Sequence, residues 1–223
     1  MNVLFTATRN YYPYLKWAMR SLMEFNDARI FVFAEDDLIP CEFPCEVINV
    51  GNGGFFTRLN VKKRFTEMSL TRVLAPRLLT VDKVLYLDVD TVVADDLTAM
   101  YETDLTDKWV AWVREKGFYK PFERDYYNFG VALMNLEQMR HDGVSERLVE
   151  LLNTQMFTFG EQDAMNLIAE GKYVELPLRF NESPCTGWTD NPAIIHYAGI
   201  GDWNTNHAMY RSEYLDKYRS VKR

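Results

Sequence analysis

The residues best suited to chemistry are two aspartates that follow an apolar run. Asp88 and Asp90 come directly after Lys83–Leu87, which reads Lys-Val-Leu-Tyr-Leu. Side chains two positions apart on an extended segment point the same way, so both carboxylates can converge on one cation while Val89 faces the opposite side. Two adjacent carboxylates are costly unless a cation neutralises them. Mg²⁺ or Mn²⁺ is the natural partner, since both prefer oxygen ligands and often share them with substrate phosphates.

A histidine can complete this cation site. His196 follows the short apolar run 193–195, and an imidazole ligand favours Mn²⁺ over Mg²⁺ because it is a softer donor than a carboxylate. Two plainer interpretations stay open. An Asp-x-Asp pair arises about once by chance in a chain of this composition, and a lone histidine most often makes structural hydrogen bonds. The position of the pair at the end of an apolar run is what favours a metal site.

The elements that must position these side chains alternate between strands and helices. Short apolar runs predict strands at Asn2–Ala7, Arg29–Ala34, 46–50, 83–87, 109–113, 129–134 and 193–195. Helical spacing predicts helices from Pro13 onward and at 65–79, 143–152 and 161–169, with Pro76 kinking or breaking the second. This alternation indicates an α/β fold with a mainly parallel sheet. Such sheets bind ligands at the carboxyl ends of their strands, where Asp88, Asp90 and His196 all fall.

Composition limits the class of protein. The chain has 223 residues, of which 48% are hydrophobic and 26% charged, which suits one globular domain over 1–223. Met1 leads almost directly into an apolar strand, and no stretch approaches the roughly 18 apolar residues of a membrane span, so we expect a cytoplasmic protein. The net charge of −7 argues against broad nucleic-acid binding, which depends on cationic contacts to phosphates.

Six segments, in sequence order, resemble glycosyltransferase family 8, the retaining group that includes glycogenin-like and bacterial lipopolysaccharide galactosyl- and glucosyltransferases. The central segment, 84–97, is similar to Y-L-D-x-D-x-x-V-x-x-D-L, and two others are similar to N-x-G-x-x-x-x-N and D-Q-D-x-x-N. The remaining matches are 6–11, 70–76 and 196–199, the last resembling the start of H-x-x-G-x-x-K-P-W. The resemblance implies a GT-A type nucleotide-binding fold, with a mainly parallel twisted sheet flanked by helices.

The resemblance also implies a role for each matching residue. Asp88, Asp90 and His196 would hold Mn²⁺ (or Mg²⁺) against the diphosphate of a UDP-sugar donor. Tyr11 would lie against the uracil. The implied donor-binding residues are Ala7, Thr8, Asn10, Tyr11, Arg72, Asp88, Val89, Asn128 and Gly199, and the implied catalytic residues are Gln162, Glu161 and Arg72. A departing nucleoside diphosphate develops negative charge, which a metal ion and an arginine can stabilise.

The chain departs from the family pattern in three places. Thr8 stands where many members have Asp, and Leu70 replaces a helix tyrosine. After Gly199 the expected Lys-Pro is missing, and Asp202 stands in that region. The missing lysine normally touches the diphosphate, so its charge must come from elsewhere. A basic, aromatic tail from about residue 210 is one source, and such tails can also rest on anionic membranes.

The expected activity is therefore metal-dependent, retaining transfer of a hexose from a UDP-sugar to a saccharide, lipid-linked glycan or protein acceptor. Gln162 is a weak nucleophile, since an amide oxygen is less basic than a carboxylate, which favours front-face attack over a covalent intermediate. Two alternatives remain. A sugar nucleotidyltransferase usually has a glycine-rich loop after its first strand, and residues 8–13 contain no glycine. A degenerate sugar-nucleotide binding protein would explain the missing lysine.

Overall fold

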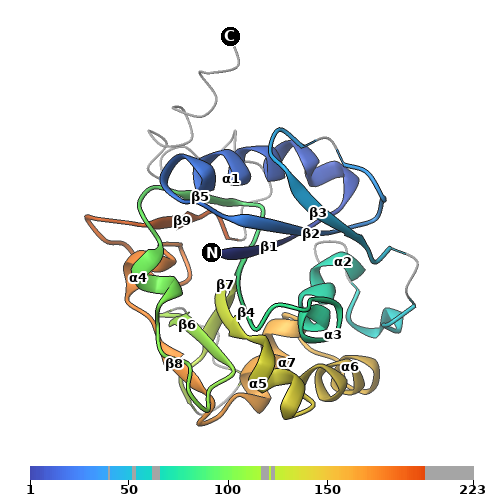
Figure 1. Ribbon diagram of the computed structural model, residues 1–223. Helices are drawn as coiled ribbons and strands as arrows, with labels where there is room; N and C mark the ends of the chain where they lie inside the picture. The colour runs from blue at the N-terminus through green and yellow to red at the C-terminus, as the bar shows by residue number, and fades with distance from the viewer. Residues whose placement is uncertain (40, 52–53, 62–65, 117–120, 122–123, 199–223) are drawn as a thin grey trace.

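A seven-stranded sheet forms the centre of the protein (Figure 1). The computed structural model describes residues 1–39, 41–51, 54–61, 66–116, 121 and 124–198. The sheet has the order β3-β2-β1-β4-β7-β6-β8. Its strands are β1 (Asn2–Ala7), β2 (Arg29–Ala34), β3 (Cys45–Asn49), β4 (Lys83–Leu87), β6 (Val110–Arg114), β7 (Tyr127–Asn135) and β8 (Tyr173–Glu175). Strands β3, β2, β1 and β4 run parallel, whereas β7 runs antiparallel to both of its neighbours.

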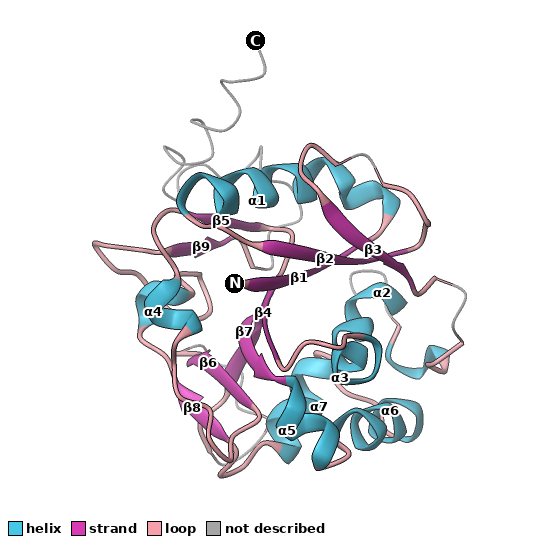
Figure 2. Ribbon diagram, viewed as in Figure 1, coloured by secondary structure: helices cyan, strands magenta, loops and turns pink. Residues whose placement is uncertain are grey.

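Helices cover both faces of this sheet (Figure 2). On one face lie α1 (Tyr12–Phe25) and α4 (Thr98–Tyr101); the other carries α2 (Glu67–Leu70), α3 (Ala75–Leu78), α5 (Leu136–His141), α6 (Val144–Thr154) and α7 (Glu161–Ile168). Alternation along the strands feeds both cores: in β1, Val3 and Phe5 pack with α1, while Leu4 packs with the opposite helices. The expected α/β fold with a mainly parallel sheet is confirmed.

Some predicted elements differ in detail. The helix expected at 65–79 is interrupted by a 3₁₀ turn, Thr71–Leu74, between α2 and α3. The break expected from Pro76 is confirmed. Proline causes it because it cannot donate to the carbonyl one turn earlier and its ring crowds that carbonyl. Sequence patterns also missed short elements, among them α4, α5, β8 and β5 (Thr91–Val93). Short elements hold too few residues to show a period.

His196 belongs to a different sheet from the one expected. Its strand, β9 (Ile194–His196), pairs antiparallel with β5 in a separate two-stranded sheet. The prediction that all three candidate ligands end strands of one parallel sheet is therefore wrong for His196. A buried apolar run of three residues does not say which strand it will pair with.

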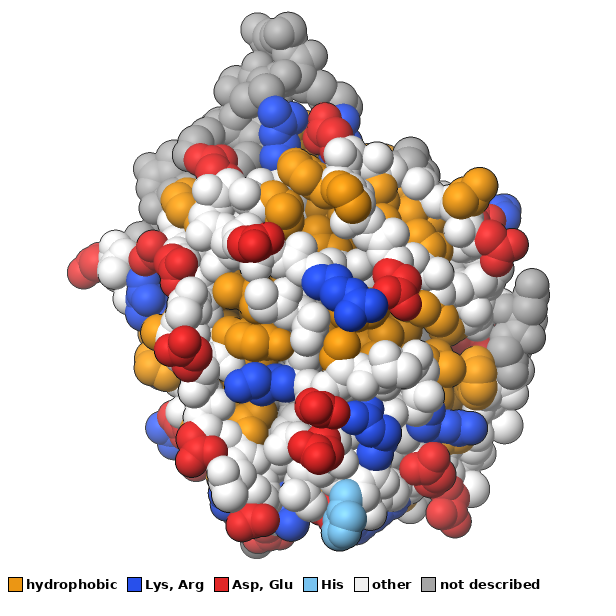
Figure 3. All heavy atoms as spheres, viewed as in Figure 1, with side chains coloured by type: hydrophobic (Ala, Val, Ile, Leu, Met, Phe, Trp, Pro, Cys, Tyr) orange, Lys and Arg blue, Asp and Glu red, His pale blue; other side chains and the backbone are white. Residues whose placement is uncertain are grey.

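Other expectations concern the surface and the chain's end. Acidic and basic side chains are interspersed over the face drawn in Figure 3. Within the described residues, no helix combines the length and apolar character needed to cross a membrane. Gly199, Asp202 and the basic tail from about 210 lie outside the described residues, so the roles expected for them stay predictions.

The two cores predict where leucine truncation destabilises the fold. Leu22 of α1 is fully buried against the sheet, whereas Leu38, after β2, is 88% exposed. We expect Leu22→Ala to lower the free energy of unfolding by about 2–5 kcal/mol, because it leaves a cavity. The matched Leu38→Ala should change it by less than about 0.5 kcal/mol. Urea denaturation of both variants measures this, and equal losses would contradict the burial of α1.

Candidate active site

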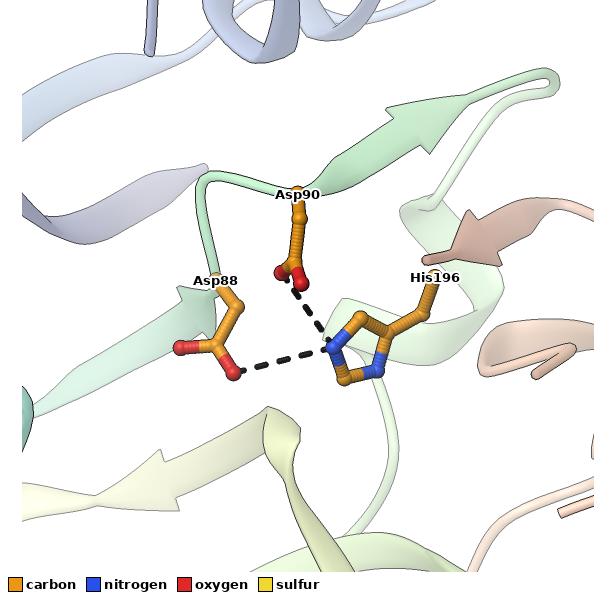
Figure 4. Close-up of side chains that lie close together, drawn as sticks. All are labelled: Asp88, Asp90 and His196. Carbon is orange, nitrogen blue, oxygen red and sulfur yellow. Dashed lines mark ion pairs between the residues drawn. The ribbon is translucent and has the colours of Figure 1, made fainter. Parts of the chain in front are cut away.

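Three potential metal ligands lie together at the end of β4 (Figure 4). The Nε2 atom of His196 is 3.3 Å from Oδ1 of Asp90 and 3.7 Å from Oδ2 of Asp88. One ligand atom from each residue falls within 4.8 Å of the others. Pairing of β5 with β9 brings them together, since it sets Thr91 opposite His196 and lets the Tyr197 N–H donate to the Asp90 carbonyl at 2.9 Å.

Gly130 makes this close approach possible. A Cβ atom built on Gly130 would lie 2.3 Å from Cε1 of His196 and 2.4 Å from Oδ2 of Asp88. The Asp88 backbone N–H donates to the Gly130 carbonyl at 2.7 Å, which fixes the distance between β4 and β7 at this level. The space in front of Gly130 is therefore filled by the candidate ligands themselves.

The protonation of the cluster fits a cation site. Burial raises the pKa of Asp88, with Arg72 opposing the shift and Asp90 adding to it. Burial alone would raise the pKa of Asp90, but the nearby His196 lowers it. Burial alone would lower the pKa of His196, but Asp90 and Asp88 raise it above its ordinary value. The cluster thus attracts a proton, which a divalent cation would displace. Two carboxylates and one imidazole suit Mn²⁺ or Mg²⁺.

Arg72 is buried beside the cluster and is engaged on every nitrogen. Its Nη2 pairs with Asp88 Oδ1 at 2.9 Å and with Glu161 Oε1 at 3.2 Å. Nη1 donates to the Phe129 carbonyl at 2.7 Å, and Nε donates to the Ser69 carbonyl at 3.1 Å. Only 5% of the residue is exposed. The arginine therefore holds two carboxylates in place, and a direct contact with a donor stays a prediction.

Glu161 carries the second carboxylate held by Arg72. It opens α7, and burial raises its pKa to about 7 against the opposing effect of Arg72. Its Oε2 atom is buried and has no hydrogen-bond partner among the described residues. An unsatisfied buried carboxylate oxygen is costly. It is therefore ready to accept a hydrogen bond from a bound hydroxyl group.

Gln162 and Asn128 are held by polar contacts. The Phe129 N–H donates to Gln162 Oε1 at 2.9 Å, and the Gly130 N–H donates to Asn128 Oδ1 at 3.0 Å. On their other sides, both amide nitrogens donate to one carboxylate oxygen, Oε1 of Glu115, at 3.1 and 2.9 Å. The structure thus joins these two predicted site residues through a third residue.

The expected base-binding residues lie at the end of β1, next to β4. Ala7 ends β1, and the turn Arg9–Tyr11 that precedes α1 carries Asn10 and Tyr11, the latter 44% exposed. Parallel pairing of β1 with β4 sets Leu4 opposite Tyr86, so the two strands end side by side. Thr8 starts the turn, and Val89 packs into the core on the α1 side. Their contacts with a nucleotide stay predictions.

Sequence reasoning missed several residues of this site. Tyr86 donates to Asp88 Oδ1 at 2.5 Å, and Asn181 Oδ1 lies 3.0 Å from His196 Nδ1. Gly130 lies in the segment 128–135, which is similar to N-x-G-x-x-x-x-N, but the sequence alone predicts no role for it. Glu115 could have been found by the rule that selected Asp88, because it follows a predicted strand at 109–113. Asn181 gave no signal, since it sits in an irregular segment.

The amino-acid sequence is similar to those of known proteins. The model of the family "Glycosyl transferase family 8" matches residues 2–206. General stress protein A of Bacillus subtilis is 25% identical over 67% of this chain and 64% of its own length. Glycosyltransferase GlyA of Streptococcus pneumoniae is 32% identical over 52% of this chain and 18% of its own. The chain thus spans less than two thirds of these relatives.

Solved structures share the fold. A galactosyltransferase, LgtC, in complex with donor and acceptor sugar analogues, superposes with a TM-score of 0.83 at 23% identity, over 99% of this chain and 96% of that one. Glycosyltransferase GlyE of Streptococcus pneumoniae gives 0.70 at 21% identity, over 99% of this chain and 64% of that one. At these identities the likeness establishes the architecture, and the expected GT-A fold is confirmed.

The contact at Gly130 predicts a selective loss of metal binding. We expect Gly130→Ala to weaken Mn²⁺ binding more than about tenfold, because the added methyl group must displace His196 or Asp88. Overpacking should also cost about 1–3 kcal/mol of stability. Gly171→Ala is the control: its added methyl meets open space, although its φ of +72° carries backbone strain. Electron paramagnetic resonance of free Mn²⁺ measures the Mn²⁺ affinity of both variants. Unchanged affinity in Gly130→Ala would show that the cluster does not bind the ion.

Proposed function

The chain belongs to glycosyl transferase family 8, and from this premise we propose that it transfers a hexose from a UDP-sugar to an acceptor hydroxyl with retention of configuration. The observation that carries the proposal is the cluster of Asp88, Asp90 and His196 against Gly130. Its surplus of negative charge calls for a divalent cation, and the same strand ends carry the turn expected to receive the nucleotide.

The three ligands would hold Mn²⁺, or Mg²⁺, against the donor diphosphate. When bound, the ion would neutralise charge that develops on the leaving group. The chain's own residues keep the ligands ready for it. Arg72 and Tyr86 bind Asp88 Oδ1, which leaves Oδ2 directed at His196. Ordered ligands lose little freedom on binding, so this arrangement favours affinity.

The transferred sugar would lie beside α7. Glu161 offers Oε2, which has no hydrogen-bond partner in the described part of the chain, as an acceptor for a sugar hydroxyl. Gln162 lies one residue further along the helix. The oxygen of Gln162 already accepts the Phe129 N–H, which makes it a poorer nucleophile still. This contact supports front-face attack, in which Gln162 stabilises positive charge on the sugar.

The reaction then needs no protein base. The bond from the anomeric carbon to the phosphate oxygen breaks, and the acceptor oxygen bonds to the same face of that carbon. The departing phosphate oxygen takes the acceptor's proton.

Asp163 of α7, a carboxylate near the site, accepts the Thr158 and Phe159 N–H groups and the Tyr126 hydroxyl. Those bonds favour a structural role for Asp163.

The proposed acceptor is a hydroxyl group of a saccharide, a lipid-linked glycan or a protein. A cytoplasmic location, with contact between the C-terminal tail and an inner membrane face, is part of the same proposal.

A donor screen is the first experiment: UDP-glucose, UDP-galactose and UDP-N-acetylglucosamine with Mn²⁺, scored for hydrolysis. UDP binding without turnover of any donor would favour the degenerate sugar-nucleotide binding protein instead.

The metal assignment predicts which aspartates matter. Asp88→Ala and Asp90→Ala should each lower Mn²⁺-dependent donor hydrolysis at least about 100-fold, because each removes a ligand. Asp82→Ala is the matched control: Asp82 immediately precedes β4 at its other end, and its exposed carboxylate pairs with Arg140. Hydrolysis is measured as UDP release. Full activity of either ligand variant, or of wild type in EDTA, would contradict the assignment.

Retention predicts the stereochemistry of the product. An α-linked UDP-sugar should give an α-linked product, because front-face attack preserves the configuration of the anomeric carbon. Proton NMR of the first-formed product distinguishes the two anomers by their coupling constants. A β-linked product would require an inverting mechanism with a carboxylate base near the acceptor.

A further inference from the structure

A chain of side-chain hydrogen bonds connects Gln162 with His196. Gln162 Nε2 donates to Glu115 Oε1 at 3.1 Å, and Asn128 Nδ2 donates to the same oxygen at 2.9 Å. Asn181 Nδ2 donates to Asn128 Oδ1 at 2.9 Å, and Asn181 Oδ1 lies 3.0 Å from His196 Nδ1. Asn128, Asn181 and His196 are all buried. The polar route from the candidate metal ligand to the carboxylate is therefore continuous and shielded from water.

Groups that can only donate or only accept fix the direction of the bonds in this chain: the Gly130 N–H near its middle and the Glu115 carboxylate beyond Asn128. The Gly130 N–H can only donate, so the Asn128 atom that faces it must be the amide oxygen. Asn181 must therefore turn its NH₂ group to that oxygen and its own oxygen to His196. The imidazole Nδ1 must then carry a hydrogen. Nε2, which faces Asp88 and Asp90, is the nitrogen left to bind a metal.

Glu115 is the acceptor at the far end of this chain. Its Oε1 receives one N–H from each amide, and its backbone N–H donates to the Tyr126 carbonyl at 2.8 Å. The adjacent Arg114 instead makes partly exposed ion pairs with Asp125 and Glu175. Burial raises the pKa of Glu115, whereas the hydrogen bonds from Asn128 and Gln162 lower it. The two amides thus stabilise the ionised carboxylate, which in turn fixes both amides.

We propose that Glu115 is a positioning residue: it holds the amides of Asn128 and Gln162 and, through Asn128 and Asn181, keeps His196 in the form that carries its hydrogen on Nδ1. The inference rests on the proposed function for the metal-binding role of His196. The hydrogen-bond chain itself stands on the described contacts. In this role Glu115 acts through its neighbours, because its Oε1 accepts from both amides.

Histidine NMR tests the direction of the chain in the wild-type protein. The sequence contains three histidines; His141 is highly exposed and serves as an internal reference, and His207 lies outside the described residues. His141→Gln and His207→Gln variants assign the signals of protein labelled with ¹⁵N-histidine. His196 should show a slowly exchanging Nδ1–H, whether its ring is neutral or protonated. A neutral ring with its hydrogen on Nε2 would overturn the proposal without any Glu115 variant.

Two substitutions of Glu115 distinguish the effect of its hydrogen-bond acceptor from the effect of its negative charge. Glu115→Leu removes the acceptor and should broaden the Nδ1–H signal and weaken Mn²⁺-dependent UDP binding about 10- to 100-fold. Glu115→Gln keeps an oxygen that can accept both amides and should restore both readouts to within a few fold. Glu175→Gln is the control, since it removes the same charge from neighbouring β8, where Glu175 contacts Tyr127 and Arg114. Calorimetric titration of UDP in Mn²⁺ measures affinity.

Each outcome decides a separate question. Wild-type behaviour of Glu115→Leu in both readouts, or an equal loss in Glu115→Gln, would overturn the positioning role. If Glu115→Leu does not fold, the wild-type spectrum and Glu115→Gln still test the proposal. Absence of UDP binding in wild type would refute the proposed function, while the Nδ1–H signal would still report on the hydrogen-bond chain.

Discussion

The site depends on one irregular stretch of backbone in β7. Residues 129–131 lack partners on β6, because the pairing jumps from Trp112 with Ala132 to Val113 with Asn128. A bulge of this kind frees backbone groups from the ladder. Two of those groups serve the site: the Phe129 carbonyl binds Arg72, and the Phe129 N–H binds Gln162. On the opposite edge of β7, the Gly130 carbonyl extends the pairing with β4 by accepting the Asp88 N–H. The backbone of Phe129 and Gly130 therefore positions Asp88, Arg72 and Gln162 relative to one another.

Charge balance is the second constraint. Arg72 lies between Asp88 and Glu161 and stacks at 4.3 Å over the Tyr86 ring. Among the described residues, Arg72 is a single buried arginine beside several carboxylates, and the surplus of negative charge favours a bound cation. In the proposed function, the cation would mediate between a chain with a net charge of −7 and the donor diphosphate.

The candidate site was only partly predictable from the residues. Asp88 and Asp90 stood out because an apolar strand ends there, and strand ends in α/β proteins carry ligands. Arg72, Glu161 and Gln162 entered through family resemblance, since an arginine or glutamine on a helix has no distinctive pattern. Glu115 and Asn181 entered only with the structure. Their role comes from contacts across 13 and 15 positions with Asn128 and His196, and no local period encodes such contacts.

The sequence by itself determined the alternation of strands and helices, the strand ends that present carboxylates, and the family, because these depend on local apolar periodicity and on motifs in fixed order. Tertiary structure decided the partners. It put β9 against β5 instead of in the main sheet and set Gly130 where no side chain fits. The physical reason is that pairing and packing are settled by the competition of surfaces distant in sequence, which is resolved only when the whole core is assembled.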